Sequence, residues 1–354
     1  MNPIRYINNI FTLETGIFNS NNDLLGYYEE AVDKLDMDVE EKEKLHKAVK
    51  YFLVGQRTRR VVDGWLDFKN FDEKAAGFER GIDESIAGLS LQLSEAFADK
   101  NISFDAVFTI SATGTIMPGI SYRLARHLPD LIRPNSLIID LGHVGCTGGV
   151  KALNLAKSLS SDFKNILVVS IEVPCTLANL QSKKVDVWQG NCTFGDGAAA
   201  LWISSDAEQG DMALELEQIH YTQKAQQGLD LIHWGYDGYY SFELADETTF
   251  NRDVQAFVLE VLKETEQTWR SNNQWAIHPA GILLLLKLSK KLGLPRGTIA
   301  PSVAHYEKFS NMSSASIMYI LKEIAKAESQ NQAINLLTMG AGFNVIYGCV
   351  RKVR

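Results

Sequence analysis

The 354-residue chain has little of what marks several specialised classes of protein. Its four cysteines, at positions 146, 175, 192 and 349, are too scattered for a disulfide framework or a clustered zinc site. The longest apolar run, AGILLLLKL, is too short to cross a bilayer, and the first residues lack the apolar core of a secretion signal. We therefore expect a cytoplasmic protein with reduced thiols and no membrane span.

The chain also has no excess of basic residues and no linker-like stretch. The formal net charge is -8, which argues against nucleic acid as a partner, because proteins that bind it usually carry a basic face. No stretch rich in proline or serine interrupts the chain, so composition marks no domain boundary. What is present, 45% hydrophobic and 22% charged residues, can bury a large core in one domain or in two fused halves.

The apolar pattern indicates an α/β protein. Residues 26–55 and 81–100 are spaced as amphipathic helices, and residues 146–160 form another. Short apolar strands lie within residues 104–113, 131–142, 164–173 and 197–204. Buried strands alternating with helices predict parallel α/β structure covered on both faces.

The C-terminal part repeats this order. A strand and turn at 272–281 precede a helix at 282–294 that Gly293 ends, and a second helix covers 313–328. Residues 333–353 have the pattern of two strands in a hairpin. We expect two similar α/β halves fused into one body.

Cys146 lies in DLGHVGCTGG, between a predicted strand and a predicted helix. The start of a helix carries partial positive charge, which favours a thiolate and lowers the thiol pKa. The neighbouring glycines let a substrate approach the backbone. A small buried thiol at a tight turn explains the same residues equally well.

His278 in WAIHPAG also follows a strand, and Asn311 in KFSNMSSAS precedes a helix. Alone, the histidine suits a structural role and the asparagine a helix cap. Strand ends converge on one crevice in open α/β folds, so the two can meet Cys146 there. A thiol with an imidazole and a carboxamide can transfer acyl groups through a thioester and stabilise an oxyanion. The spacing equally admits a papain-like hydrolase.

The motifs GCTGG, HPAG and SNMSSAS resemble the Cys-His-Asn triad of the type III polyketide synthases, chalcone-synthase-like enzymes of the thiolase fold. SATGTIMPGISYRLARHL, LVVSIEVPC and FGDGAAALWIS extend the similarity over roughly residues 55 to 350. The resemblance implies two similar βαβαβ halves packed as a five-layered αβαβα body. The halves would be residues 1–205, carrying Cys146, and residues 206–354, carrying His278 and Asn311.

The resemblance also implies an acyltransferase reaction. Cys146 would take an acyl group from a coenzyme A (CoA) or acyl-carrier-protein thioester. His278 and Asn311 would hold a malonyl thioester and stabilise the enolate left by its decarboxylation, with the backbone N–H of Cys146 completing the oxyanion hole. The enolate would attack the acyl-Cys146 thioester in a Claisen condensation. No metal and no tightly bound cofactor is expected, because decarboxylation supplies the carbanion.

Further roles follow from the resemblance alone. Met117 in TIMPGI would reach across a homodimer interface into the partner's pocket. Three residues match the cationic segment that meets the phosphates of CoA or of a carrier protein's phosphopantetheine: Arg57, Arg59 and Arg60. The substrate pocket would include Cys175, with Tyr240 and Phe242 as aromatic gatekeepers.

The similarity changes at the C-terminal end. MGAGFNVIYG stands where the family has a Gly-Phe-Gly-Pro-Gly loop, and it is more similar to the ketoacyl-acyl-carrier-protein synthases III. The main alternative is therefore a single-condensation enzyme of that kind. A Cys-His-Asn hydrolase or acyltransferase that consumes no malonate is another alternative, as is a silent partner subunit of a heterodimeric synthase. The starter group, the number of condensations and the cyclisation mode depend on cavity volume, which no motif encodes.

Overall fold

The protein is built around a nine-stranded mixed sheet. The computed structural model describes residues 3–236, 238, 240–244, 247–265, 269, 274–327 and 332–354. The strand order is β11-β12-β13-β8-β1-β7-β6-β4-β5. The strands are β1 (Tyr6–Leu13), β4 (Ala106–Ser111), β5 (Leu137–Gly142), β6 (Asn165–Glu172), β7 (Gly197–Ser204), β8 (Leu214–Gln223), β11 (Gln274–Ile277), β12 (Ala333–Gly340) and β13 (Asn344–Lys352).

The two halves of this sheet repeat one topology. From β1 outward, β7 and β6 join by antiparallel pairing and β4 by parallel pairing. From β8 outward, β13 and β12 join by antiparallel pairing and β11 by parallel pairing. Where the halves meet, β1 and β8 pair through Tyr6 with Glu215 and Ile7 with Leu214. The expectation of two similar α/β halves is confirmed.

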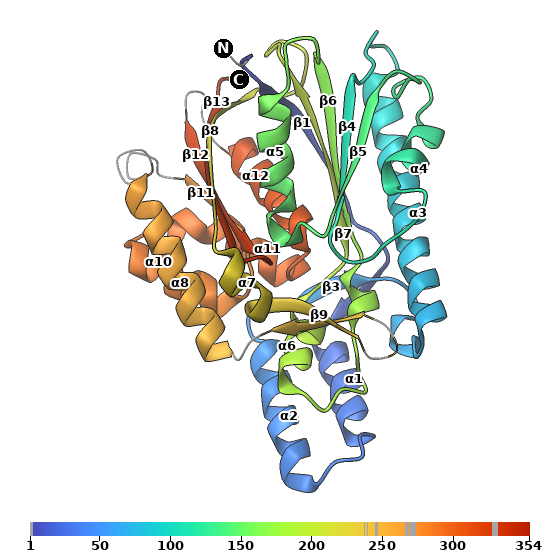
Figure 1. The fold of residues 1–354 in the computed structure, drawn as a ribbon, viewed down its shortest axis with the longest axis vertical. Coiled ribbons are helices and arrows are strands. Elements are labelled where there is room, and N and C mark those ends of the chain that lie inside the picture. Colours follow the sequence, from blue (N-terminus) through green and yellow to red (C-terminus); the bar gives the residue numbers. More distant parts are fainter. Residues whose placement is uncertain are drawn as a thin grey trace.

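The expected parallel pairing is found for β4, β5 and β6 but not for β7, and the predicted hairpin of β12 and β13 is present. Parallel pairs are β4 with β5, β4 with β6, and β11 with β12. The short turn between β12 and β13 enforces antiparallel pairing there. Between β6 and β7 the chain passes through helix α6 (Val185–Thr193), which lies beyond the end of the sheet instead of crossing its face (Figure 1), so β7 returns antiparallel.

Helices make the other three layers of the body. Their bounds are α1 (Asn21–Asp33), α2 (Val39–Phe52), α3 (Phe71–Phe97), α4 (Ile120–His127), α5 (Gly148–Ser158), α7 (Ala225–Leu231), α8 (Glu247–Glu264), α10 (Ile282–Leu292), α11 (Ala300–Phe309) and α12 (Ser316–Ala327). Figure 1 shows α5 and α12 between the two halves of the sheet, with α3 and α4 outside one half and α8 and α10 outside the other. The predicted αβαβα body is confirmed.

Two small antiparallel sheets complete the fold: β2 (Ile17–Ser20) with β3 (Thr58–Val61), and β9 (Ile232–Tyr236) with β10 (Tyr240–Leu244). The predicted helix at 26–55 is two helices, because Asp38 caps α2 in a reciprocal box with Glu41. Gly293 ends α10 in the left-handed conformation, as expected. In the described part of the chain no helix is both long and apolar enough to span a membrane.

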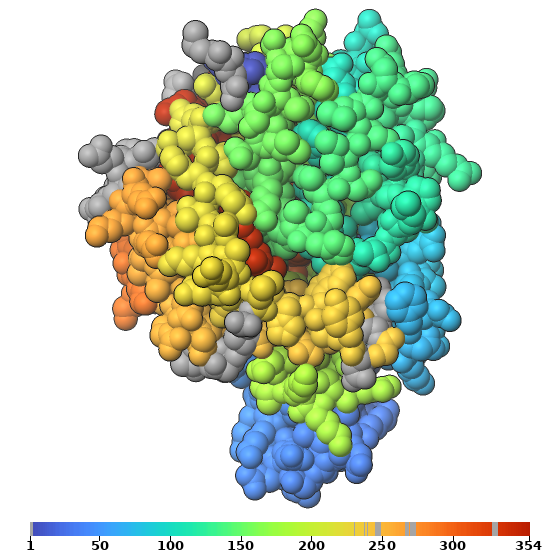
Figure 2. All heavy atoms as spheres, in the orientation of Figure 1, coloured from blue at the N-terminus to red at the C-terminus, as the bar shows by residue number. Residues whose placement is uncertain are grey.

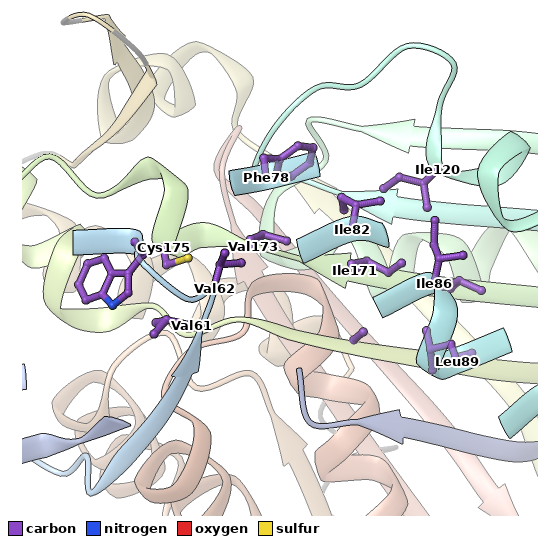
Figure 3. Packing of buried hydrophobic residues seen from close by; sticks show 14 of the residues in the cluster. Val61, Val62, Phe78, Ile82, Ile86, Leu89, Ile120, Ile171, Val173 and Cys175 are labelled. Atoms are coloured by element: carbon purple, nitrogen blue, oxygen red, sulfur yellow. The ribbon is translucent and has the colours of Figure 1, made fainter. Parts of the chain in front are cut away.

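The core shows why these elements form. Phe78, Ile82, Ile86 and Leu89 are spaced three and four residues apart on α3, so they share one face and point toward the sheet (Figure 3). The central helices meet closely where they begin. A Cβ on Gly149 would lie 2.8 Å from the Ser314 carbonyl oxygen, so glycine lets α5 start against the segment that leads into α12.

Candidate active site

Cys146 lies in a short 3₁₀ turn (Gly145–Thr147) between β5 and α5. Gly145 has φ 62°, a left-handed conformation that favours glycine. Gly340, at the end of β12, packs against the same turn. A Cβ on Gly340 would lie 3.1 Å from the Cys146 backbone nitrogen and 3.3 Å from the Cys146 Cβ. Glycines from two parts of the chain thus leave room around the thiol and its N–H group.

Asn311 follows α11 and precedes a second 3₁₀ turn (Ser313–Ala315). Its side-chain oxygen accepts a hydrogen bond from the Ser313 N–H at 2.8 Å, which fixes the carboxamide and leaves its NH₂ group to other partners. Asn311 lines one cavity together with Cys146, and the Asn311 and Ser313 side chains lower the pKa of the Cys146 thiol. The structure therefore brings Cys146 and Asn311 together.

The expected low pKa of the Cys146 thiol is wrong. Burial, with a smaller contribution from the nearby Glu172 carboxyl, raises the pKa of Cys146 to about 12. Hydrogen bonds from Ser313, Asn311 and the residue's own N–H lower it, without offsetting the loss of solvation. The resting side chain is a thiol, so its proton must pass to a base before sulfur can attack.

His278 is placed at the C-terminal end of β11, where its backbone N–H donates to the Leu337 carbonyl at 2.8 Å. Its ring is 1% exposed, and neither ring nitrogen has a partner among the described residues. Burial lowers the pKa of His278 to about 3, so the resting imidazole is neutral. His278 itself is not among the residues that line the cavities at Cys146, although Ala280, two residues further on, lines the narrow one described next.

A narrow cavity of about 40 Å³ lies on one side of Cys146. Asn311, Gly340 and Phe250 help to line it. A neighbouring pocket beside α2 and α10 shares four lining residues with it: Gln189, Thr193, Phe250 and Ala280. These residues form a shared wall, so the pocket and the narrow cavity lie next to each other between helices α2 and α10 and the thiol.

A larger cavity of about 410 Å³ lies on the other side of Cys146. Trp234, Tyr236 and Tyr240 from β9 and β10 form an aromatic wall, with the Trp234 and Tyr240 ring centres 4.5 Å apart. In Figure 2 the surface is hollowed where the green segment that contains the turn Gly145–Thr147, the red β12–β13 turn and the golden β9–β10 sheet meet.

Two phenylalanines separate the cavities. Phe194 and Phe242 line both, and their ring centres are 4.7 Å apart at an interplanar angle of 60°. Tyr240 lines the larger cavity but not the narrow one. The sequence analysis missed Phe194, although FGDGAAA was among the motifs that it used. The altered GAGFNV segment also contributes to the walls of both cavities, since Ala341 lines the larger cavity and Phe343 lines the narrow one.

Two pocket and binding expectations need correction. Cys175 is 5% exposed, lies beside Val62 and Val173 in the core (Figure 3), and its Sγ contacts Asp196 at 2.8 Å. It lines neither cavity at Cys146. Arg59 is 1% exposed and binds main-chain carbonyls, so it cannot present its charge to a phosphate group in solvent.

The other residues of this set lie at the surface. Arg57 is exposed and pairs with Glu307 at 3.4 Å, and Arg60 is partly exposed and pairs with Glu14 at 2.9 Å. Met117 is 93% exposed. Its placement at a homodimer interface stays a prediction.

Glu172 is a second residue near the site that the sequence analysis missed. It is 1% exposed at the end of β6 and accepts hydrogen bonds from the Ala112 N–H and the Thr113 hydroxyl, both at 2.9 Å. Burial raises the pKa of this carboxyl. The one sign of Glu172 in the sequence is that it is an acidic residue near the end of the otherwise apolar strand LVVSIEV.

The fold and the thiol between two cavities define an acyl-transferring enzyme of the thiolase type. Models of the N-terminal and C-terminal domains of chalcone and stilbene synthases match residues 99–207 and 244–349. The chain belongs to the chalcone and stilbene synthase family.

Two relatives agree with this assignment. A Bacillus subtilis (strain 168) protein named "Putative chalcone synthase" is 27% identical over 256 residues, which cover 68% of each chain. The crystal structure of the C-terminal type III polyketide synthase domain of Steely1, a type I/III hybrid from Dictyostelium, superposes with a TM-score of 0.85 at 18% identity. That match covers 99% of this chain and 100% of the other and supports the fold.

The reaction follows from the family. The protein is a type III polyketide synthase, an acyltransferase that joins acyl and malonyl thioesters by decarboxylative Claisen condensation. The single-condensation alternative is not favoured by these matches.

Proposed function

We propose that Cys146, His278 and Asn311 are the catalytic residues of this polyketide synthase. The observation that carries the proposal is the arrangement at the thiol: Cys146 lines a narrow cavity together with Asn311 and a larger cavity together with Ser313. We propose that His278, whose ring is neutral and has no partner among the described residues, takes the thiol proton once an acyl-CoA is bound. We propose the division at residues 205 and 206 as the boundary of the two halves.

In the first step, Cys146 sulfur attacks the carbonyl carbon of an acyl-CoA. His278 takes the thiol proton and returns it to the departing CoA sulfur. The Cys146 N–H, kept clear by Gly340, donates to the oxyanion that forms. The product is an acyl-Cys146 thioester and free CoA.

In the second step, a malonyl-CoA loses carbon dioxide. The electron pair of the broken bond becomes an enolate whose oxygen is held by His278 and by the NH₂ group of Asn311. The enolate carbon attacks the acyl-Cys146 carbonyl, and the cysteine sulfur leaves. This forms one new carbon–carbon bond for each carbon dioxide released. Both reactants bring their own activated thioester, so we propose that no tightly bound cofactor or metal takes part.

The two cavities suit different parts of the substrates. We propose that the narrow cavity and the neighbouring pocket beside α2 and α10 hold the slim pantetheine arm of CoA, and that the larger cavity holds the growing chain. Arg57 and Arg60 are the members of the basic segment with exposed surface for the CoA phosphates. We further propose a cytoplasmic homodimer in which the exposed Met117 meets the partner.

Intact-mass spectrometry tests the proposal. Purified protein is incubated with a panel of acyl-CoA thioesters, and then with malonyl-CoA while carbon dioxide is measured. We expect a mass gain of one acyl group that is absent in Cys146→Ala, and carbon dioxide release that is absent in Asn311→Ala. Free acid formed without malonyl-CoA consumption would show a hydrolase instead. A wild-type protein that neither acylates nor decarboxylates contradicts the proposal.

A further inference from the structure

The C-terminal end of α6 is buried next to the active site. A helix leaves its last carbonyl groups without partners inside the helix, and buried carbonyls need donors from elsewhere. Here these carbonyls belong to Asn191 through Phe194, which are largely buried. Thr193 lines the narrow cavity and Phe194 separates the two cavities, so whatever binds these carbonyls also places the walls of the site.

Arg59 supplies most of the missing donors. Its Nη1 donates to the Asn191 and Phe194 carbonyls at 3.0 and 2.7 Å, and its Nη2 donates to the Cys192 carbonyl at 2.8 Å. The planar guanidinium presents several donors in a fixed fork, and positive charge is favourable at the C-terminal end of a helix. The hydroxyl of Tyr28 adds a hydrogen bond to the Asn191 carbonyl at 2.6 Å.

The remaining carbonyl, that of Thr193, faces the catalytic asparagine. It accepts from the Asn311 N–H at 3.1 Å, and the Gly195 N–H donates to the Asn311 carbonyl at 3.1 Å. Phe194 and Asn311 are therefore joined main chain to main chain. A shift of this segment moves Phe194 and Asn311 together.

Gln56, close to Arg59 in sequence, binds both sides of this arrangement. Its Nε2 donates to the Cys192 carbonyl at 2.8 Å, and its Oε1 accepts from the hydroxyl of Ser310, the residue before Asn311, at 2.7 Å. The motif QRTRR thus contributes interior hydrogen bonds at the junction of α6 and the Asn311 segment.

We propose that Arg59 is a positioning residue: it holds the end of α6 so that the Asn311 carboxamide reaches the thiol and Phe194 faces Phe242. This inference rests on the proposed function of Asn311. It predicts that a change at Arg59 impairs malonyl decarboxylation, which needs the Asn311 carboxamide, more than it impairs acylation of Cys146.

Arg5 offers a matched control. It is also fully buried, and it donates to the main-chain carbonyls of Leu159, Ser160 and Phe163, far from Cys146. The experiment compares Arg59→Lys with Arg5→Lys in thermal unfolding, Cys146 acylation by acyl-CoA, and carbon dioxide release from malonyl-CoA. A lysine keeps the charge and loses the fork, so both variants are expected to lose stability.

Only Arg59→Lys should show a selective chemical defect. We expect decarboxylation about 10- to 100-fold slower, because misplacing a catalytic group by about 1 Å has effects of that size. Acylation should change by less than about threefold, since the thiol itself is held by another turn. Arg5→Lys should keep the wild-type ratio of the two rates.

A gentler pair covers the case in which Arg59→Lys does not fold. Tyr28→Phe removes one donor to the Asn191 carbonyl, and Tyr319→Phe removes a buried hydroxyl that donates to the Leu13 carbonyl at 2.7 Å. Tyr28→Phe should lower the decarboxylation rate selectively and Tyr319→Phe should not. The inference is overturned if the Arg59→Lys and Tyr28→Phe variants decarboxylate malonyl-CoA at the wild-type rate. It is also overturned if the control variants at Arg5 and Tyr319 show the same selective loss. Inactive wild-type protein instead overturns the proposed function.

Discussion

Replacing Gly340 with alanine would put a methyl group against the backbone of the proposed nucleophile. The new Cβ would lie 3.1 Å from the Cys146 nitrogen, 3.3 Å from the Cys146 Cβ and 3.4 Å from the Thr147 nitrogen. Carbon atoms pack best at about 3.5 to 4.0 Å, so the turn must move by a few tenths of an ångström. That turn carries both the thiol and the N–H group assigned to the oxyanion.

The expected cost falls on the rate of acylation. Removing one oxyanion donor outright lowers a rate by about 10²- to 10³-fold, and a displaced donor retains part of its effect. We therefore expect Gly340→Ala to acylate Cys146 about 10- to 100-fold more slowly than wild type. Stability should change by less than about 2 kcal/mol, since mild overpacking is offset by the lower entropy of the unfolded alanine chain.

Single-turnover acylation, followed by intact mass after rapid quenching, measures this effect. Gly348→Ala is the matched control, because its Cβ would lie 3.3 Å from the Gln218 carbonyl oxygen on the neighbouring strand β8, a similar crowding away from Cys146. Its acylation rate should stay at the wild-type level. The reasoning is refuted if Gly340→Ala acylates as fast as wild type, or if Gly348→Ala is slowed equally.

Three further predictions follow from burial and cavity shape. Burial lowers the pKa of His305 to about 3 from an ordinary 6.5, so the folded state binds fewer protons than the unfolded state and stability falls as pH drops below about 6.5. Between pH 8 and pH 5 the free energy of unfolding should therefore fall by about 2 kcal/mol less in His305→Phe than in wild type, as measured by urea unfolding at both pH values. Equal losses in the two proteins would contradict this. Phe242→Ala should join the two cavities and lengthen the polyketide products seen by mass spectrometry, whereas Tyr240→Phe should leave the product lengths as in wild type. Iodoacetamide should label Cys146 before the other three cysteines, because Cys175, Cys192 and Cys349 are at most 5% exposed, although the protonated Cys146 thiol should react slowly; earlier labelling of any of these three would count against the buried packing.

Much of the fold could be predicted because its elements have strong local patterns. The apolar runs of β4, β6 and β7, the hairpin of β12 and β13, and the stop at Gly293 all lie within the predicted ranges. Strand β1 was missed. Its sequence YINNIFTL mixes asparagines with apolar residues, and it is a strand because β7 and β8 pair with it on both sides. Such pairing involves residues far apart in sequence, which a local pattern does not contain.

The candidate site divides in the same way. The glycine-flanked turn at Cys146 and the Asx-type turn at Asn311 are local devices, so their motifs were sufficient to find them. Whether a charged side chain is buried or exposed is not decided by its neighbours in sequence. Arg59 looks like its neighbours in QRTRR, yet it faces the interior because β3 alternates its side chains and covers the end of α6.

The sequence by itself therefore determined the family, the strands and helices with strong local patterns, and the positions of the three proposed catalytic residues, because periodicity and turn chemistry depend on neighbouring residues. Only the tertiary structure decided which groups lose their solvent. Folding buries Cys146, which raises the pKa of its thiol, and it places Arg59 and Cys175 in the interior. It also brings the Phe194 ring against the Phe242 ring. Solvation and packing depend on segments that meet only after folding, and these contacts shape the two cavities that receive the substrates.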